Sequence, residues 1–184
     1  PQTPGVLAVR DTPYTELRVV EHRDLRYLLL DGGTHSFVQI EDNATRQAYV
    51  MVTELATELF DRPGRALIVG LGAGCLARQL AVANWQVDAV EIDAEVTRAA
   101  REFFRFRPEF AAVHHADGRR FLRSTSRTWD LIVLDAFGSG SVPFHLLTAE
   151  AFAEARARLA PGGVIAVTLE AVGWQRHDRH FEEE

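Results

Sequence analysis

The chain has 184 residues, of which 47% are hydrophobic and 25% are charged, and its formal net charge is −6. These totals are typical of one globular domain with a substantial core, and no apolar run approaches the ~18–20 residues of a membrane-spanning helix. All 20 basic residues are arginine, which excludes a lysine Schiff base and the lysine of a P-loop, and the lack of a basic stripe argues against nucleic-acid binding.

The first 42 residues predict an arm and a small antiparallel sheet. Residues 1–13 are proline-rich and aperiodic, which predicts a loose arm. Three short runs rich in Val, Leu, Ile, Tyr and Phe follow, at 16–22, 25–31 and 35–40. Asp31-Gly32-Gly33 between the last two is a hairpin signal, because glycine accepts positive φ.

A helix is predicted next, with Asn43 as its N-cap. Apolar residues then recur at three- and four-residue steps, which is typical of an amphipathic helix; they are Ala48, Met51, Val52, Leu55 and Leu59.

From residue 66 onward, continuous apolar strands alternate with helices. The predicted strands are 66–69, 87–91, 111–115, 131–135 and 164–169, and the predicted helices are 74–83, 94–105, 117–124 and 147–159. This pattern indicates a parallel sheet covered on both faces. The predicted fold is therefore α/β: a doubly wound, Rossmann-like sheet over residues 43–184, with its ligand crevice at the carboxyl ends of the strands.

A glycine-rich turn, Gly70-Leu71-Gly72-Ala73-Gly74, directly follows the first of these strands. Glycines allow a tight turn and a close ligand approach at the start of a helix, so Gly70, Gly72 and Gly74 are candidate cofactor-binding residues. A merely tight turn explains them as well.

Acidic residues follow the next two strands. Glu91 comes about 20 residues after Gly70, where a carboxylate can accept both ribose hydroxyls. It could instead cap a helix, although Asp93 is the better candidate for that cap. Asp117 and Gly118 follow the third strand, where Asp117 could contact an adenine amino group or cap the next helix.

The fourth strand ends on Asp135, ahead of a loop that contains Gly138, Ser139 and Gly140. A nicotinamide site would favour a glycine at position 75, where Cys75 stands. Carboxylates after several strands suit the positive charge of an adenosyl-sulfonium cofactor better. Asp135 could accept a proton from an attacking amine or hydroxyl if burial raises its pKa, and the glycines would let the loop close over a substrate.

The remaining polar signals are weak. The single cysteine excludes an intrachain disulfide and a multi-cysteine zinc site. His114-His115 and the pair His177 and His180 lack nearby cysteines or a clear acid partner, so we expect no metal ion. We expect a cytoplasmic protein that binds neither a membrane nor nucleic acid.

From about residue 14 to residue 169, the chain resembles the spermidine synthase family, the polyamine aminopropyltransferases of the Rossmann-like methyltransferase superfamily. The matching segments are ALIVGLGAG, VDAVEID, HHADGRRFL, WDLIVLDAF and LAPGGVIAV. They stand where the family has its glycine motif, ribose acid, adenine-site Asp-Gly, gate aspartate and final turn. In detail the chain is more similar to a divergent, spermidine synthase-like branch, in which Asp-Ala-Phe and a following Pro-x-His-Leu replace the usual loop.

Position by position, the resemblance implies roles for individual residues. Glu91 becomes the ribose ligand and Asp117 the adenine contact, while Asp135 deprotonates or orients the attacking amine. Tyr49 matches a family tyrosine near the substrate, although a half-buried helix tyrosine is an equal interpretation. The implied co-substrate is S-adenosylmethionine or its decarboxylated form, the implied partner is a small-molecule amine, and the implied assembly is a homodimer.

The chain also departs from the family at positions that would serve an amine or the decarboxylated donor. Ala73 and Gly138 replace aspartates, Thr15 replaces a glutamine, and Val50-Met51 replaces a polar pair. A buried ammonium without paired carboxylates is costly.

Three functions therefore stay open. They are aminopropyl transfer from decarboxylated S-adenosylmethionine to an amine, methyl transfer from S-adenosylmethionine to an unknown small molecule, and a non-catalytic binding domain of the same fold. Residues 170–184 cannot supply the further strands of the family, so we expect either that a partner covers the open sheet edge or that the chain belongs to a longer protein.

Overall fold

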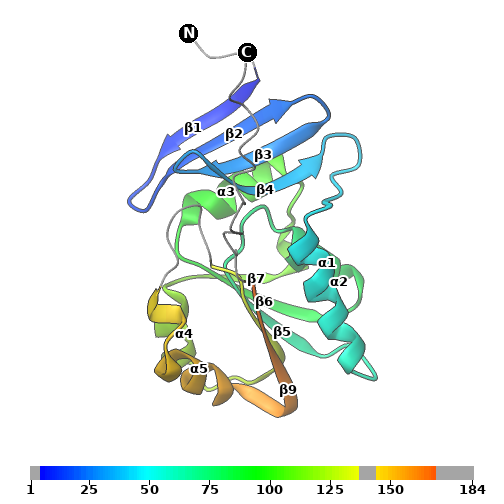
Figure 1. Cartoon of the computed structure of the whole chain (residues 1–184), viewed down its shortest axis with the longest axis vertical. Helices are drawn as coiled ribbons and strands as arrows, with labels where there is room; N and C mark the ends of the chain where they lie inside the picture. The colour runs from blue at the N-terminus through cyan, green and yellow to red at the C-terminus, as the bar shows by residue number, and fades with distance from the viewer. Residues whose placement is uncertain (1–4, 137–143, 169–184) are drawn as a thin grey trace, which may run out of the picture.

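The computed structural model describes residues 5–136 and 144–168, apart from the side chains of Tyr49 and Val52. It contains a four-stranded antiparallel sheet and a five-stranded parallel sheet, which lie one above the other in Figure 1. Both the α/β class and the doubly wound sheet preceded by a small antiparallel sheet are confirmed. Among the described residues, none of the helices has the length and apolar character needed to cross a membrane.

The antiparallel sheet contains one more strand than the sequence predicted. Its strands, in spatial as well as chain order, are β1 (Val6–Asp11), β2 (Glu16–His22), β3 (Leu25–Leu30) and β4 (Gly33–Gln39). The prediction of a loose arm over residues 1–13 is wrong for β1, which pairs with β2 from Val6 opposite Val20 to Asp11 opposite Glu16. Prolines precede and follow β1 in the sequence without interrupting it, so they bound the strand.

The predicted hairpin between β3 and β4 is confirmed. Leu30 pairs with Gly33, which leaves Asp31 and Gly32 as a two-residue turn. Both have positive φ, 49° and 80°, as a turn of this kind requires.

The helix after the antiparallel sheet begins later than predicted and buries a different face from the one predicted. It comprises α1 (Ala48–Leu55) and the 3-10 helix η1 (Ala56–Leu59). Asn43 is not its N-cap: the residue is buried with φ 59°, and its side-chain Nδ2 donates to the carbonyl of Phe104 at 2.7 Å. Tertiary contact with this carbonyl outweighs the local capping preference.

The apolar stripe expected to face the core from this helix is largely exposed. Met51, Leu55 and Leu59 are 56%, 65% and 69% exposed, whereas Val50 and Thr53 are buried. The helix therefore packs through the face that carries Val50, because this residue contacts the apolar cluster formed with α2.

The parallel sheet has the spatial order β7-β6-β5-β8-β9. Its strands are β5 (Arg65–Val69), β6 (Gln86–Glu91), β7 (Ala112–His115), β8 (Trp129–Leu134) and β9 (Leu159–Val167). The helices between them are α2 (Cys75–Val82), α3 (Ala94–Phe103), the 3-10 helix η2 (Pro108–Phe110), α4 (Gly118–Ser124), the 3-10 helix η3 (Phe144–Leu146) and α5 (Ala149–Arg156). The strands β5, β6 and β7 are added in one direction across the sheet, and β8 and β9 are then added on the other side of β5. The order of strands therefore reverses between β5 and β8, where ligands of such sheets bind.

The boundaries differ from prediction mainly at the end of the sheet. Helix α5 begins after Thr148, whose side chain accepts from the backbone N–H of Ala151, and the helix is shorter than the predicted 147–159. Strand β9 begins at Leu159, five residues before the predicted start, and its register with β8 is irregular between Trp129 and Leu131. The Pro-Gly-Gly segment therefore lies within an irregular strand.

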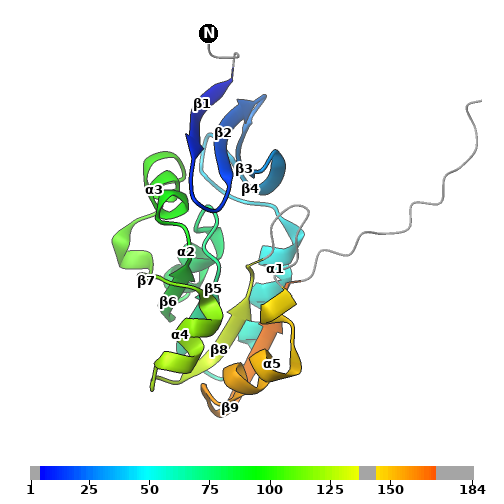
Figure 2. The same ribbon diagram turned by 90° about the vertical axis from the view of Figure 1, so that its left-hand side faces the viewer.

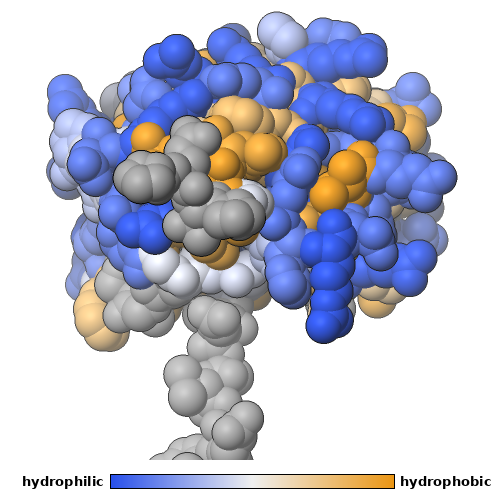
Figure 3. Space-filling view, turned by 90° about the horizontal axis from the view of Figure 1, so that it is seen from above, coloured by the Kyte–Doolittle hydropathy of each residue, from blue (hydrophilic) through white to orange (hydrophobic). Residues whose placement is uncertain are grey.

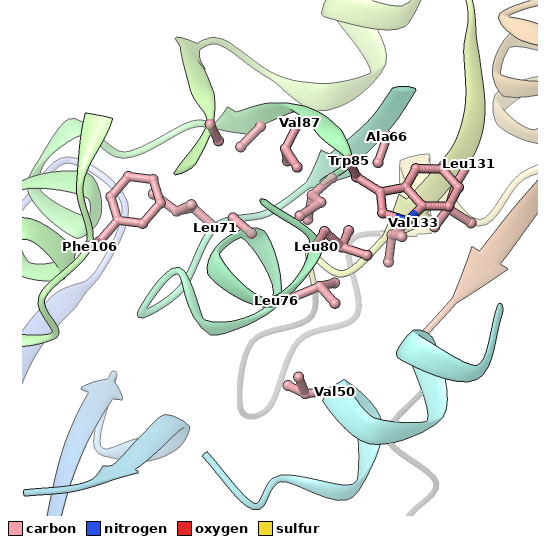
Figure 4. Packing of buried hydrophobic residues seen from close by; sticks show 14 of the residues in the cluster. Val50, Ala66, Leu71, Leu76, Leu80, Trp85, Val87, Phe106, Leu131 and Val133 are labelled. Carbon is pink, nitrogen blue, oxygen red and sulfur yellow. The ribbon is translucent and has the colours of Figure 1, made fainter. Parts of the chain in front are cut away.

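Three apolar clusters hold these layers together. Helices α1 and α2 lie on one face of the parallel sheet, and α4 and α5 lie on the other (Figures 1 and 2). Figure 4 shows the cluster under α2, in which Leu76, Leu80 and Trp85 pack near strand residues Ala66 and Val133. The opposite cluster centres on alternate strand residues and on the buried Trp129, Leu122 and Leu146.

The antiparallel sheet shares the third cluster with α3. Leu17, Leu28 and Val38 are fully buried there against Val96 and Ala99. The guanidinium of Arg10 lies 2.6 Å from Glu102 and 3.4 Å from Glu95, while Arg26 donates to the carbonyl of Phe103. These contacts place the antiparallel sheet against the carboxyl end of the parallel sheet.

Candidate functional site

A cavity of about 340 Å³ lies between the two sheets, at the carboxyl ends of the parallel strands. It is as large as typical sites for small molecules. The surface seen from above in Figure 3 is mostly hydrophilic, with apolar side chains gathered near its centre.

The parallel sheet supplies the cavity wall that the sequence predicted. Gly70 follows β5, Glu91 ends β6, Asp117 and Gly118 follow β7, and Asp135 follows β8. The structure thus brings together five of the eight predicted site residues around one cavity, because parallel strands present their carboxyl ends at the same edge. Their contacts with a ligand stay a prediction.

The glycine turn packs closely against neighbouring segments of the chain. A Cβ on Gly70, whose φ is 101°, would lie 2.3 Å from the carbonyl oxygen of Asp135. Gly72 meets the antiparallel sheet in the same way, since a Cβ there would lie 2.7 Å from Ser36 Oγ and 3.2 Å from His35 Nδ1. Gly72 and Gly74 do not line the cavity, and Gly74 is the N-cap of α2. The turn's glycines therefore allow close backbone approach, and their proposed contact with a cofactor stays a prediction.

Two parts of the predicted site lie outside the described residues. Tyr49 belongs to α1, but its side chain is not described. The loop containing Gly138, Ser139 and Gly140 also lies outside the described ranges. Their roles stay predictions.

Glu91 is held by the backbone of the cavity wall. Its side chain is 8% exposed, and its two carboxylate oxygens accept hydrogen bonds from the backbone N–H of Leu71 at 3.0 Å and of Asp93 at 2.9 Å. Burial raises the pKa of Glu91. The backbone hydrogen bonds from Asp93 and Leu71 oppose this shift, and the negative charge of Asp93 adds to it, so the net shift is upward. A carboxylate has about four acceptor sites, so Glu91 keeps capacity to accept a hydrogen bond from a ligand hydroxyl.

Asp93 caps α3 as predicted, with Oδ1 accepting from the backbone N–H of Glu95 at 2.9 Å. Its Oδ2 is buried beside the cavity and makes no hydrogen bond within the described part of the chain. A second acid therefore borders Glu91 at this end of the cavity.

Asp117 combines the two interpretations that the sequence left open. Its Oδ1 accepts from the backbone N–H of Arg120 at 2.8 Å, which confirms the helix cap. Its Oδ2 lies 3.1 Å from Nε2 of His145, and both side chains line the cavity. Asp117 can therefore cap α4 and still present lone pairs to a ligand.

Asp135 is placed by the two central strands. It directly follows β8, which ends at Leu134, one residue earlier than predicted. Its backbone N–H donates to the carbonyl of Val69 at 2.8 Å, which fixes it beside Gly70 at the reversal point of the sheet.

The antiparallel sheet supplies a second wall, of which the sequence analysis indicated only Thr15, through the family resemblance. Tyr14 and Thr15 precede β2, Asp31 lies in the β3–β4 turn, and His35 lies in β4. The hairpin signal at Asp31 located a turn, but nothing local in the sequence indicated that the turn faces a cavity. These residues reach the cavity because β2, β3 and β4 pair with one another and the resulting sheet packs over the carboxyl ends of the parallel strands.

Ala73 lies beneath the antiparallel sheet and not at the cavity surface, where the family resemblance had suggested a ligand-binding position. The residue is 2% exposed and does not line the cavity, and its backbone N–H donates to Ser36 Oγ at 3.2 Å. Because β4 covers position 73, the cavity surface next to the glycine turn belongs to His35.

The cavity has a mixed lining of apolar and polar residues, and acids predominate among its ionisable residues. Its lining carboxyl side chains are Asp31, Glu91, Asp93, Asp117 and Asp135. Two imidazoles, those of His35 and His145, also line it, but none of the described lining residues is lysine or arginine. Such a lining favours a cationic ligand. The described residues hold no group of three His, Cys, Asp or Glu side chains placed to bind a metal ion.

The chain is similar to several proteins in sequence and in structure. A polyamine aminopropyltransferase of Vibrio vulnificus is 34% identical over 165 residues, which cover 83% of this chain and 55% of that protein. The crystal structure of a probable spermidine synthase from Corynebacterium glutamicum superposes with a TM-score of 0.77 at 24% identity, over 87% of this chain and 62% of that one. Human methyltransferase-like protein 13, crystallised in complex with SAH, gives a TM-score of 0.52 at 27% identity, over 62% and 60% of the two chains.

The extent of these matches defines what they show. The chain spans about half the length of the curated aminopropyltransferases it matches. The family model for the spermine/spermidine synthase domain matches residues 47–183, which is most of the chain. Together with the parallel sheet and its acidic cavity, this match shows that the chain belongs to the spermine/spermidine synthase family.

Proposed function

We propose that the chain binds decarboxylated S-adenosylmethionine in the cavity and transfers its aminopropyl group to an amine. The observation that carries the proposal is the convergence of Glu91, Asp117 and Asp135, from three different strand ends, on one acidic cavity. The similarity to the polyamine aminopropyltransferase of Vibrio vulnificus supports the reaction class.

We assign each acid a role that suits its position in the cavity. Glu91 accepts the ribose hydroxyls, Asp117 faces the nucleobase end, and Asp135 lies toward the reacting carbon. Carboxylates on both walls stabilise the sulfonium and the ammonium groups that this donor and a diamine carry. Asp31 adds a carboxylate from the antiparallel sheet, on the side of the cavity opposite the strand ends.

The reaction is a displacement at the carbon next to the sulfonium. The amine nitrogen supplies the electron pair of the new C–N bond, and the electrons of the broken C–S bond stay on sulfur, which leaves neutral methylthioadenosine. The nitrogen then releases a proton, which Asp135 accepts or passes to water. The cavity contributes by aligning nitrogen, carbon and sulfur.

Methyl transfer is the second candidate, and one observation favours it. Position 73 is a buried alanine under Ser36, so the glycine turn offers no acid to an aminopropyl ammonium. The similarity to human methyltransferase-like protein 13 is compatible with the intact donor. The intact and decarboxylated donors differ by one carboxylate, so their relative affinities separate the two candidates.

Calorimetry followed by product analysis tests the proposal. We expect tighter binding of decarboxylated than of intact S-adenosylmethionine. We also expect that adding a diamine yields methylthioadenosine and an aminopropylated amine in equal amounts by mass spectrometry. Tighter binding of the intact donor with S-adenosylhomocysteine as product supports methyl transfer, and binding of either donor without turnover supports a non-catalytic domain.

A further inference from the structure

His145 lines the cavity beside Asp117, and the proposed function has given it no role so far. It lies in η3, between Phe144 and Leu146, and its side chain is 50% exposed. Its Nε2 lies 3.1 Å from Oδ2 of Asp117, across an interval of 28 residues in sequence. Two elements that are separate in the chain therefore meet beside the cavity.

The backbone of His145 is anchored from two sides. Leu146 is 3% exposed and packs in the cluster that contains Val69 and Leu122. Arg119 donates from Nη1 to the carbonyl of His145 at 3.4 Å, and its guanidinium donates two further hydrogen bonds of 2.9 and 3.2 Å to the carboxylate of Glu154. The imidazole therefore extends from a fixed position toward the cavity.

The chemistry of the contact determines where the imidazole proton lies. A carboxylate accepts hydrogen bonds and cannot donate one, so Nε2 of His145 carries the proton. In the neutral ring, Nδ1 is then a hydrogen-bond acceptor. Because Arg120 holds Oδ1 of Asp117 and His145 holds Oδ2, the carboxylate cannot rotate freely.

We propose that His145 is a specificity-determining residue, which positions Asp117 for an exocyclic amino group on the bound nucleobase; this inference rests on the proposed function. The fixed Asp117 carboxylate accepts from the amino group of a 6-aminopurine. The carbonyl oxygen of a 6-oxopurine would face the same carboxylate without a proton between them, which is unfavourable. Without His145, the carboxylate can turn away and tolerate either base.

Calorimetry with two nucleosides tests this role, using 5′-methylthioadenosine and its 6-oxo analogue 5′-methylthioinosine. We expect the wild-type protein to favour the 6-amino nucleoside by about tenfold or more. His145→Ala should reduce that preference about tenfold. His145→Gln keeps an N–H donor at similar reach and should keep the preference within about threefold of the wild type.

The outcomes separate this inference from the proposed function. A preference unchanged in His145→Ala, or equal weakening of both nucleosides, overturns the role of His145 and leaves the proposed function intact. Failure of the wild-type protein to bind either nucleoside overturns the proposed function and this inference together. A wild-type preference that His145→Ala removes and His145→Gln retains supports positioning by the N–H group.

Discussion

Strand β6 carries two buried carboxylates three positions apart, Asp88 and Glu91, and they differ in nearly every other respect. Asp88 is 6% exposed and is surrounded by side-chain donors: His114 Nε2 at 2.8 Å, Trp129 Nε1 at 2.9 Å and Arg127 Nη1 at 3.0 Å. Glu91 is 8% exposed, but its hydrogen bonds come from backbone N–H groups, and it borders the cavity.

The pKa values of the two acids shift in opposite directions. Burial alone would raise the pKa of Asp88, but hydrogen bonds from His114 and Trp129 and the charge of Arg127 outweigh it, so the net shift is downward. At Glu91, burial dominates and raises the pKa. An acid saturated by side-chain donors stabilises the fold, whereas an acid left with spare acceptors beside a cavity is available to a ligand.

The largest expected effect concerns the chemistry at the cavity edge. Asp135→Asn should lower turnover by about 100-fold or more, because the amide cannot accept the proton, and donor affinity should stay within about twofold. Steady-state rates and calorimetry measure the two quantities. Asp61→Asn, which removes an exposed acid away from the cavity, is the matched control. Unchanged turnover in Asp135→Asn would remove its role.

The second prediction tests the structural acid. Asp88→Asn should lower the free energy of unfolding by about 1–2 kcal/mol, because the hydrogen bonds from His114 and Arg127 lose their charged acceptor, while the half-exposed Arg127 side chain can be rehydrated. Denaturant unfolding measures this change, and calorimetry should show nearly unchanged donor affinity. A large loss of affinity without a loss of stability would contradict the contrast with Glu91.

The third prediction tests the ligand-facing acid. Glu91→Gln should weaken binding of 5′-methylthioadenosine about 10- to 100-fold, because a single amide oxygen replaces two carboxylate acceptors for the ribose. An adenine nucleoside that lacks both ribose hydroxyls serves as the control ligand, and its affinity should change much less. Equal losses for both ligands would mean that Glu91 acts only on the fold.

The fourth prediction concerns the antiparallel wall. His35→Ala should change the ratio of affinities for intact and decarboxylated S-adenosylmethionine about fivefold. It should leave the affinity for 5′-methylthioadenosine within about twofold, because that nucleoside lacks the donor's charged tail. A uniform change across all three ligands would show that His35 does not distinguish the tails.

The smallest expected effect is a divergent response to pH. The folded-state pKa of Asp88 is lowered, so its stabilisation is present above the unfolded value near 3.8 and is lost as pH falls through the folded value. The pKa of Glu91 is raised, so the cost of its buried charge disappears as pH falls from the folded value toward 4.5.

Urea unfolding at several pH values checks these signs. The stability deficit of Asp88→Asn relative to the wild type should shrink in acid. Glu91→Gln should lose stability relative to the wild type on going from neutral pH to pH 5, because only the wild type gains from protonation. Parallel trends for the two variants would contradict the opposite pKa shifts.

Much of the parallel-sheet wall could be predicted from the sequence. The apolar strands, the glycine turn and the acids that follow the strands locate Gly70, Glu91, Asp117 and Asp135 at one edge, since every parallel strand ends there. The caps at Asp93 and Asp117 were also predictable from residue type. Strand β1 and the rotation of α1 were not, because each depends on pairing or packing with a distant element.

The sequence by itself determined the α/β class, the order of its elements and the acids at the strand ends, because these follow from local periodicity and from the geometry of parallel strands. Only the tertiary structure decided that Asp31 and His35 close the cavity, that Ser36 covers Ala73 and that His145 meets Asp117. These contacts join segments distant in the chain. Their formation depends on how two sheets and several helices pack together, which no local pattern encodes.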